Sequence, residues 1–465
     1  MNALRSNTQF RRVYFAIIGF LLLLGFLVPS AGAFGIKGET IPARAVLTHG
    51  PIAGGVTDTS AVIFTRTSGL SFVRILYSTD PELATDLNYS RRVFALLKND
   101  YTVHIVLDGL QPNTTYYYNV IVGGAAQNHA ITPRFTTAPP PDSLTNFSFS
   151  VFSDLSSRPR IDAPAYQSAQ GDSPVFVLQI GDFDHRDPGS PNRPVISIDN
   201  WRRMHRSVLQ DNASGQDFST FITPFFPIYH IWDDHDYGAN NSDRTAPWKA
   251  LATQAFKEYY PLPPLPNPDG GLWYQFRYAQ AEFFVLDLRS QRDPNDLPPS
   301  STKSMLNGGG ISGGQKDWLK TGLLESQARW KFIVSSSVWN PNSKQNDSWF
   351  LFPNEQEELV QFIQDQSISG VIILSGDLHS GGAIDDGTNS FFPEISVPTT
   401  NITSQRDCTG GYCGTWSEGV VTGIDPSGYA LITVIHDEIL GTDRVILQAK
   451  GADGVTRLEY VVELD

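Results

Sequence analysis

The stretch Val175–His185, VFVLQIGDFDH, joins a short apolar run directly to an acidic turn. A run of β-branched and aromatic residues of this length is typical of a buried strand. The arrangement recurs in Phe147–Phe152 followed by Asp154, in Pro227–Trp232 followed by Asp233-Asp234-His235-Asp236, and in Val371–Leu374 followed by Ser375-Gly376-Asp377-Leu378-His379. In an α/β sheet the carboxyl ends of the strands share one edge, where ligands bind. We therefore expect these acidic and histidine side chains to converge at one edge.

The segments between these runs favour helices, so this part of the chain alternates strands and helices. Two further strand candidates are Glu282–Leu288 and Trp330–Ser335. The clearest helix candidates are Ser197–Gln210, Pro247–Tyr260, Ser312–Glu325 and Asn354–Asp365, with Ser312 and Asn354 as expected N-caps. The alternation predicts an α/β architecture.

The preceding part of the chain has the pattern of an all-β domain. Its strand candidates, separated by turn residues, are Ser60–Arg66, Val73–Ser78, Tyr101–Leu107 and Thr115–Val122. Such spacing over about 100 residues is typical of a β-sandwich. The proline-rich stretch Ala138–Asp142 is a stiff linker. We therefore predict a sandwich domain over residues 40–138 and a second domain over residues 145–465.

The N-terminus has the pattern of a signal peptide over residues 1–33. An apolar run, Val13–Val28, follows three arginines and ends before the small residues Ala31-Gly32-Ala33. The alternative is an uncleaved membrane anchor, but a bilayer span needs about 20 apolar residues and this run is shorter. We expect a secreted, periplasmic or cell-surface protein, with no stable membrane anchor once the leader is cleaved. Whether the leader is cleaved or retained is left open.

Composition excludes several classes of protein. The chain has 465 residues, a formal net charge of −14 and only two cysteines. The acidic balance argues against a specific nucleic-acid-binding surface, and two cysteines exclude a disulfide scaffold and a cysteine-rich metal protein. Cys408 and Cys413 could form a small local disulfide or remain two thiols. Glycosylation is also left open for the seven sequons, at Asn88, Asn113, Asn146, Asn212, Asn240, Asn346 and Asn401.

Convergence of so many carboxylates requires a counter-charge. An unpaired, desolvated charge costs several kcal/mol, and no comparable basic cluster is evident in the sequence, so we expect metal cations. Oxygen ligands with a few histidine nitrogens suit Zn, Fe, Mn, Mg or Ca. Taken singly, a Gly-Asp after a strand can be a turn, and Asp-Asp-His-Asp can be a solvated loop. The joint pattern at four strand ends favours the metal site.

The ordered set Asp154, Gly181-Asp182, Asp233-Asp234-His235-Asp236 and Gly376-Asp377-Leu378-His379 resembles the calcineurin-like metallophosphoesterases. The Ile231-Trp232 prefix and the Leu286-Asp287-Leu288-Arg289 stretch resemble the PhoD-like, or alkaline phosphatase D, branch. This resemblance implies an α/β metallophosphatase β-sandwich flanked by helices. It also implies a small, immunoglobulin- or fibronectin-like all-β domain before it.

The resemblance further implies two metal ions. Asp182 would bridge them, with Asp154, His185 and His379 completing the first site and Asp234 and Asp377 completing the second. The first site would hold Fe, Mn or Zn, and the all-carboxylate second site would hold Ca, Mn or Mg. The chain departs from the branch in two ways. It has no cysteine at Ser153-Asp154-Leu155-Ser156, and it has His185 where relatives use a tyrosine ligand.

The resemblance predicts a secreted phosphoester hydrolase, an alkaline phosphatase or phosphodiesterase, that uses a metal-bound hydroxide. His235 would protonate the leaving oxygen, unless it is a histidine in a polar loop. Arg289 would bind the phosphate, unless it forms a structural salt bridge with Asp287 or another nearby acid. The alternative function is a catalytically inactive, metal-stabilised surface-binding protein. We expect a monomer, and the monoester or diester preference and the physiological substrate are left open.

Overall fold

The computed structural model describes residues 44–155, 163–190, 192, 195–210, 218–310, 312–401, 408, 411–422 and 426–464. Residues 45–465 form one compact unit. The leader predicted over residues 1–33 and the sequon at Asn212 lie outside the described residues. In the described part of the chain, every helix is too short or too polar to cross a bilayer.

A ten-stranded mixed sheet forms the first layer. Its path runs β23 (Thr456–Leu464), β22 (Thr442–Gly451), β21 (Gly428–Asp437), β10 (Phe147–Leu155), β11 (Val177–Gln179), β12 (Ile228–His230), β1 (Leu47–Gly54), β2 (Ser60–Thr67) and β6 (Thr102–Asp108), with β19 (Thr399–Asn401) also paired to β10. The three strands β10, β11 and β12 run parallel. Their carboxyl ends therefore lie at the same end of this sheet.

A seven-stranded sheet forms the second layer. Its order is β13 (Tyr274–Tyr278), β14 (Ala281–Val285), β15 (Trp330–Ser335), β16 (Val371–Ser375), β18 (Glu394–Ser396), β17 (Ala383–Asp385) and β20 (Gly419–Val420). The strands β14, β15, β16 and β18 run parallel.

Side-chain alternation along the strands builds the core between the two sheets. On β10, the ring of Phe149 meets Phe283 of β14, with ring centroids 5.1 Å apart. Phe152, on the opposite face of the same strand, packs against Tyr166 of helix α1 (Pro164–Gly171). On β14, Phe284 turns away from Phe283 and meets Trp318 of helix α6 (Gln315–Glu325). Successive strand side chains point to opposite faces, and the central strands β10, β11, β15 and β16 are buried on both faces.

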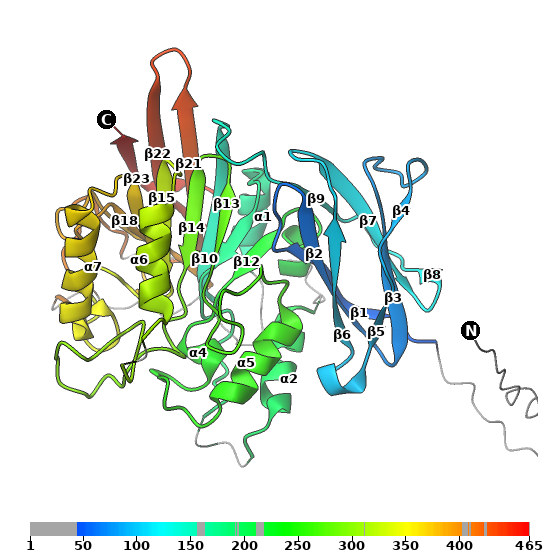
Figure 1. Cartoon of the computed structure of the whole chain (residues 1–465), viewed down its shortest axis with the longest axis horizontal. Helices are drawn as coiled ribbons and strands as arrows, with labels where there is room; N and C mark the ends of the chain where they lie inside the picture. Colours follow the sequence, from blue (N-terminus) through cyan, green and yellow to red (C-terminus); the bar gives the residue numbers. More distant parts are fainter. Residues whose placement is uncertain are drawn as a thin grey trace, which may run out of the picture. The chain divides into compact units, whose positions relative to one another are not determined.

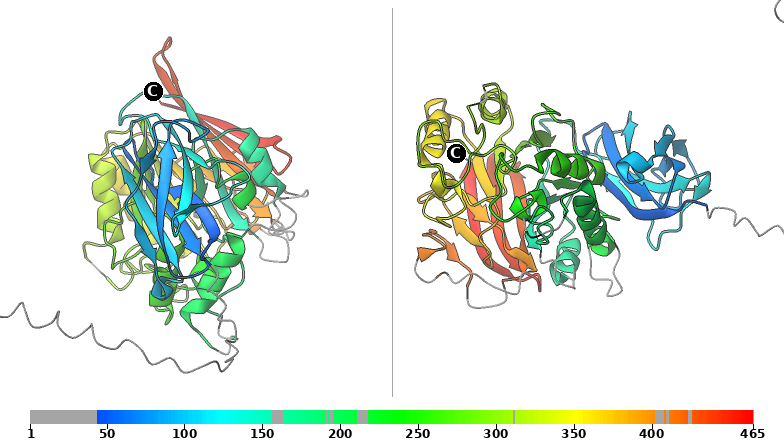
Figure 2. Two further views of the ribbon diagram at one scale, coloured as in Figure 1. Left: turned by 90° about the vertical axis from the view of Figure 1, so that its right-hand side faces the viewer. Right: turned by 90° about the horizontal axis from the view of Figure 1, so that it is seen from below.

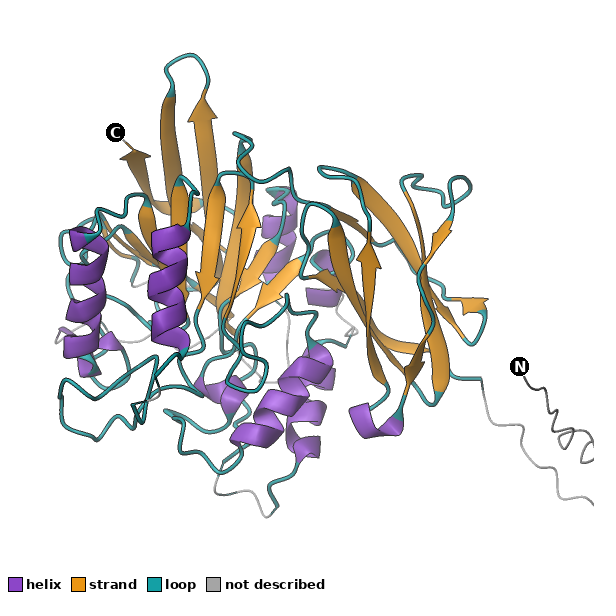
Figure 3. Cartoon of the chain, viewed as in Figure 1, coloured by secondary structure: helices purple, strands orange, loops and turns teal. Residues whose placement is uncertain are grey.

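Helices cover the outer faces of the sandwich (Figure 3). Helices α6 and α7 (Pro353–Asp365) pack on the second sheet through leucines and isoleucines of a shared apolar cluster. Helices α1, α2 (Ile198–Val208) and α5 (Lys249–Tyr259) contribute to the core of the first sheet. Two single-turn helices, α3 (Phe218–Phe221) and α4 (Asp234–Tyr237), and two short 3-10 turns, Leu97–Asn99 and Trp349–Leu351, complete the set. This confirms the predicted β-sandwich flanked by helices.

The N-terminal strands form a smaller sandwich at one end of the unit, drawn in blue to cyan (Figures 1 and 2). The strands β1, β2 and β6 face a six-stranded sheet of β4 (Asn88–Tyr89), β3 (Ser71–Ser78), β7 (Thr115–Val122), β8 (Ala125–Ala126), β5 (Val93–Ala95) and β9 (Arg134–Thr136). On β2, Ile63 enters the core of this sandwich, whereas Phe64 packs towards Tyr259 of α5. The expected linker, Ala138–Asp142, lies between β9 and β10.

The structure corrects several local expectations. The predicted helices are present. Three are shorter than predicted, and α7 begins one residue earlier, at Pro353. The expected N-caps Ser312 and Asn354 are wrong, because α6 is capped at Gly314 and α7 starts with Pro353 after Phe352. Proline suits this position because the first helical N–H has no intrahelical partner. Cys408 and Cys413 form the local disulfide that the sequence left open, with Cα atoms 5.0 Å apart.

Candidate metal centre

The acidic strand ends converge, but from two sheets and not from the single edge expected. Asp154 lies near the end of β10, and Asp182 follows β11. Asp234 is the first residue of α4, directly after β12. Asp377 and His379 follow β16 of the second sheet. The two sheets face each other, so their carboxyl ends bring these side chains together across the mouth of the sandwich.

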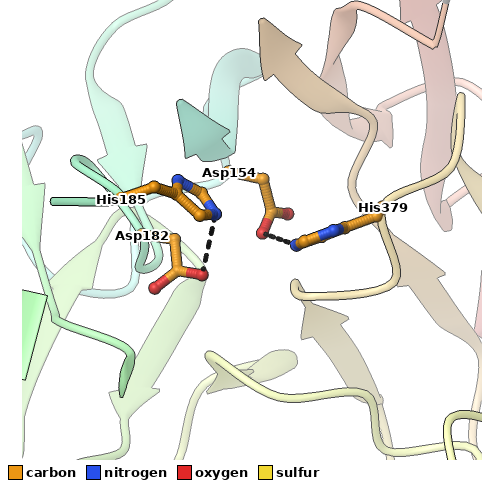
Figure 4. A group of neighbouring side chains, drawn as sticks. All are labelled: Asp154, Asp182, His185 and His379. Carbon is orange, nitrogen blue, oxygen red and sulfur yellow. Dashed lines mark ion pairs between the residues drawn. The ribbon is translucent and has the colours of Figure 1, made fainter. Parts of the chain in front are cut away.

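Four side chains form the first cluster, Asp154, Asp182, His185 and His379 (Figure 4). One ligand atom from each lies within 4.8 Å of the others. Nε2 of His379 is 3.1 Å from Oδ1 of Asp154, and Nε2 of His185 is 3.4 Å from Oδ2 of Asp182. This is the set predicted for the first metal.

The inward-facing atoms of this cluster lack hydrogen-bond partners. Oδ1 of Asp154, Oδ2 of Asp182 and Nε2 of both histidines are buried, and none makes a hydrogen bond of acceptable geometry with the described residues. Nδ1 of His185 lies 2.8 Å from the carbonyl oxygen of Leu155. A metal-ligating histidine commonly donates its other N–H to such an oxygen, which leaves the facing nitrogen free to coordinate. The donor set therefore fits a cation with mixed oxygen and nitrogen ligands.

The backbone at this site is held in a rarely populated conformation. Asp154, Asp182, Asp377 and His379 have φ between +50° and +66°, which is uncommon for residues with a side chain. Gly181 has φ +117°, and a Cβ there would lie 2.6 Å from Cβ of Asp233. The close approach of two strand ends thus requires glycine at this position.

Two further acidic groups share Asp182. It lies with Asp234 and His235 in one, and with Asp233 and Asp377 in the other. The structure therefore brings both predicted second-site carboxylates, Asp234 and Asp377, to Asp182, although in separate groups. It also adds Asp233, to which the sequence assigned no ligand role.

Burial and neighbouring charges shift the pKa values of the cluster in opposite directions. Burial raises the pKa of Asp182 well above its usual range, and the charges of Asp234 and Asp233 raise it further. Burial also raises the pKa of Asp154, but His379 outweighs it and lowers that pKa to about 2. Burial lowers the pKa of His185 to about 4, so its imidazole is neutral and able to bind a cation.

His235 lies beside the first cluster with a carboxylate of its own. Its Nδ1 is 2.6 Å from Oδ1 of Asp187, and its ring centroid is 4.4 Å from that of His185. Burial lowers the pKa of His235, but the charges of Asp234 and Asp187 outweigh burial and raise the pKa to about 9. The imidazole is therefore a proton donor at neutral pH.

Arg289 is fully buried, and its guanidinium forms ion pairs with two carboxylates. Its Nε and Nη2 lie 2.5 and 2.6 Å from the two oxygens of Asp233, and Nη2 also lies 2.9 Å from Asp347. The residue is 0% exposed. This pairing matches the salt-bridge alternative, with Asp233 and Asp347 as partners in place of Asp287.

Basic side chains do enter the cluster, contrary to expectation from the sequence. Lys344 pairs with Asp377, and Arg289 lies 3.5 Å from the same carboxylate. Arg292 pairs with Asp347 behind Arg289. Sequence reasoning missed Lys344 because it lies in a loop with no motif. It missed Asp187 although that residue follows the quoted Gly-Asp-Phe-Asp-His stretch by two positions.

Asp184 and Asp236, which lie beside the candidate ligands Asp182 and Asp234, stabilise the backbone of the site. Asp236 closes a capping box at the start of α4, and its Oδ2 accepts from the amide of Phe183, 3.2 Å away. Asp184 pairs with Arg186. These contacts fix the backbone on which Asp182 and Asp234 are presented.

Comparison with known proteins finds similarity over both parts of the chain. Residues 165–407 match the family model of the PhoD-like phosphatases, and residues 35–139 match the model of the PhoD-like phosphatase N-terminal domain. Alkaline phosphatase D of Bacillus subtilis is 28% identical over 432 residues, which cover 82% of this chain and 73% of that protein.

Solved structures show the same fold. A structure of PhoD aligns with a TM-score of 0.70 at 22% identity, over 89% of this chain and 90% of its own. The purple acid phosphatase PPD1 from yellow lupin (Lupinus luteus) seeds aligns with a TM-score of 0.59 at 14% identity, over 91% of this chain and 75% of its own. The predicted fold class and the predicted resemblance are both confirmed.

Proposed function

The chain belongs to the PhoD-like phosphatase family, and from this premise we propose that it hydrolyses phosphoesters with two bound cations. The observation that carries the proposal is the cluster of buried ligand atoms on Asp154, Asp182, His185 and His379, which make no hydrogen bond with the described residues. A folded protein rarely leaves buried polar atoms without partners. A bound cation is the partner that this donor set fits.

Asp182 is the residue best placed to bridge two cations, because it belongs to all three acidic groups. Asp154, His185 and His379 would complete the first site, which suits Fe, Mn or Zn. Asp234 and Asp377 would hold the second cation, for which oxygen-only ligands favour Ca, Mn or Mg. When bound, such cations neutralise charge on a phosphoryl group and lower the pKa of water towards about 7.

His235 would donate the proton that the leaving alkoxide needs. Its raised pKa keeps the imidazole protonated at neutral pH, and Asp187 orients the ring through Nδ1. A positioned general acid of this kind contributes typically about 10²–10⁴-fold to the rate.

Arg289 would act as a positioning residue. Its guanidinium holds Asp233 and Asp347, and Asp233 precedes the ligand Asp234. The direct contact with phosphate that the sequence suggested has less support, because every nitrogen of the guanidinium already donates to a carboxylate.

We further propose that the protein is exported and that it acts as a monomer on a phosphoester substrate. Support for export comes from the basic, apolar and small-residue pattern of residues 1–33. The net charge of −14 argues against a nucleic-acid surface.

Metal analysis of the purified chain, combined with a substrate panel, tests the proposed activity. We expect about two bound cations per chain and hydrolysis of p-nitrophenyl phosphate, bis(p-nitrophenyl) phosphate or both. Chelation should abolish the activity, and adding back Ca, Mn or Fe should restore it. Bound metal without turnover of any ester would instead favour the inactive, surface-binding alternative.

A further inference from the structure

Lys344 is a buried lysine inside the acidic cluster. It is 5% exposed, its ammonium pairs with Asp377, and Nζ lies 4.0 Å from Oδ2 of Asp347. Lysine is rarely buried this far unless it is paired. Its charge therefore belongs to the electrostatics of the site and not to the surface of the molecule.

The fold holds this lysine in place from both sides. Its amide donates to the carbonyl oxygen of Tyr412, 2.8 Å away, and its own carbonyl accepts from the amide of Asp347 at 3.1 Å. Four residues earlier in the same loop, Nδ2 of Asn340 donates to the carbonyl of Thr415 at 2.8 Å. Tyr412 and Thr415 flank Cys413, which the disulfide ties to Cys408. The loop of residues 340–347 is thus hydrogen-bonded to the part of the chain that carries the disulfide.

The positive charge is distributed unevenly over the cluster. Asp377 faces the ammonium of Lys344 and, at 3.5 Å, the guanidinium of Arg289. Within the described residues, the ion pairs of Asp154 and Asp182 are with histidines alone. One end of the cluster therefore carries lysine and arginine side chains, and the ion-pair partners at the other end are histidines.

We propose that the ammonium of Lys344 partly neutralises Asp377 and so weakens metal binding at that carboxylate. The two cation sites would then differ in affinity. The proposal rests on the metal centre described under the proposed function. An ammonium and a divalent ion on the same carboxylate repel each other. A cation should therefore bind tightly beside Asp154 and weakly beside Asp377, where it has to displace or tolerate the lysine.

Calorimetric titration of the metal-free full chain with Mn²⁺ or Ca²⁺, with metal content checked by mass spectrometry, tests this. We expect two classes of site in the wild type. Lys344→Met should tighten the weaker class by about tenfold or more and leave the tighter class little changed. Lys344→Arg, which keeps the charge, should preserve the difference. Lys331→Met is the matched control, because Lys331 is also buried but donates to the carbonyl of Ala328.

The outcomes separate this inference from the proposed function. Cation binding by the wild type with identical titrations for Lys344→Met would overturn the role of Lys344 and leave the metal centre standing. So would a variant that only raises KM for the ester, since that would make Lys344 a phosphate ligand. If the wild type binds no cation at all, the metal centre itself fails. If Lys344→Met does not fold, Lys344→Gln, which also removes the charge, is titrated in its place: a tighter weak site supports the proposal, and an unchanged weak site contradicts it.

Discussion

Nδ1 of His235, in helix α4 after β12, lies 2.6 Å from Oδ1 of Asp187, in the loop after β11. The pair resembles the His–Asp arrangement by which a carboxylate orients an imidazole and stabilises its charged form. It therefore gives the proposed general acid both a fixed ring and a raised pKa.

Asp187→Asn should move the high-pH limb of kcat to lower pH. His235 acts when protonated, so activity is lost as pH rises through its pKa, which Asp187 raises. Removing an opposite charge at hydrogen-bond distance should lower that pKa by roughly one to three units. A pH–rate profile with a model phosphate ester measures the shift, and a limb that does not move would argue against the pair.

His235→Ala should slow turnover by about 10²–10⁴-fold while metal content is retained. The loss should be largest for esters with poor leaving groups, which depend most on protonation. His436→Ala serves as the control, because His436 also has Nδ1 on a carboxylate, 2.9 Å from Asp443, on the β21–β22 hairpin. Equal rates for the wild type and His235→Ala with a poor leaving group would reject the assignment.

Asp182→Ala should remove bound metal and activity together, since Asp182 belongs to every acidic group of the site. Mass-spectrometric metal content and ester turnover are measured on the same preparation. Asp199→Ala, at an acid whose side chain is 66% exposed, is the control and should change neither quantity. Retention of full metal content in Asp182→Ala would remove the basis for a bridging carboxylate.

Arg289→Met should lower the free energy of unfolding by about 3–5 kcal/mol, because it leaves Asp233 and Asp347 as buried carboxylates without their shared partner. Urea denaturation gives the stability, and steady-state kinetics give KM. Arg244→Met is the control, because Arg244 pairs with Asp293 at a more exposed position. A rise in KM with unchanged stability would instead support the direct phosphate contact predicted from the sequence.

Gly181→Ala should destabilise the protein more than Gly310→Ala. Both glycines have positive φ, at +117° and +72°, but only at Gly181 would the new Cβ meet another residue, Asp233, at 2.6 Å. The left-handed backbone alone costs about 1–2 kcal/mol for a residue with a side chain, and Gly181→Ala adds the contact with Asp233 to the cost of its own backbone conformation, so its thermal midpoint should fall further. Equal midpoints would show that the two strand ends can separate at little cost.

The convergence of the ligands could be predicted from the sequence because each one follows a strand. Asp154 lies near the end of its strand, and Asp182, Asp234 and Asp377 follow theirs within a few residues. Strand ends are a strong constraint on position. The arrangement in two facing sheets could not be predicted, because an apolar run predicts a buried strand and carries no information on which sheet that strand joins. Lys344 and Asp187 escaped prediction because loop residues are placed by tertiary contacts, such as the bond from Lys344 to Tyr412, and not by local periodicity.

Strand β1 pairs in parallel with β12 at Gly54 and Ile228, so the small N-terminal sandwich closes the side of the catalytic sheet next to the strand that leads into Asp233. An open strand there would offer unpaired amide and carbonyl groups to other chains. Although the N-terminal segment matches its own family model, its strand β1 extends the sheet of the second domain, so the two parts share one continuous sheet. A fragment that begins after the proline linker would lack β1 and expose the edge of β12, so it should tend to self-associate.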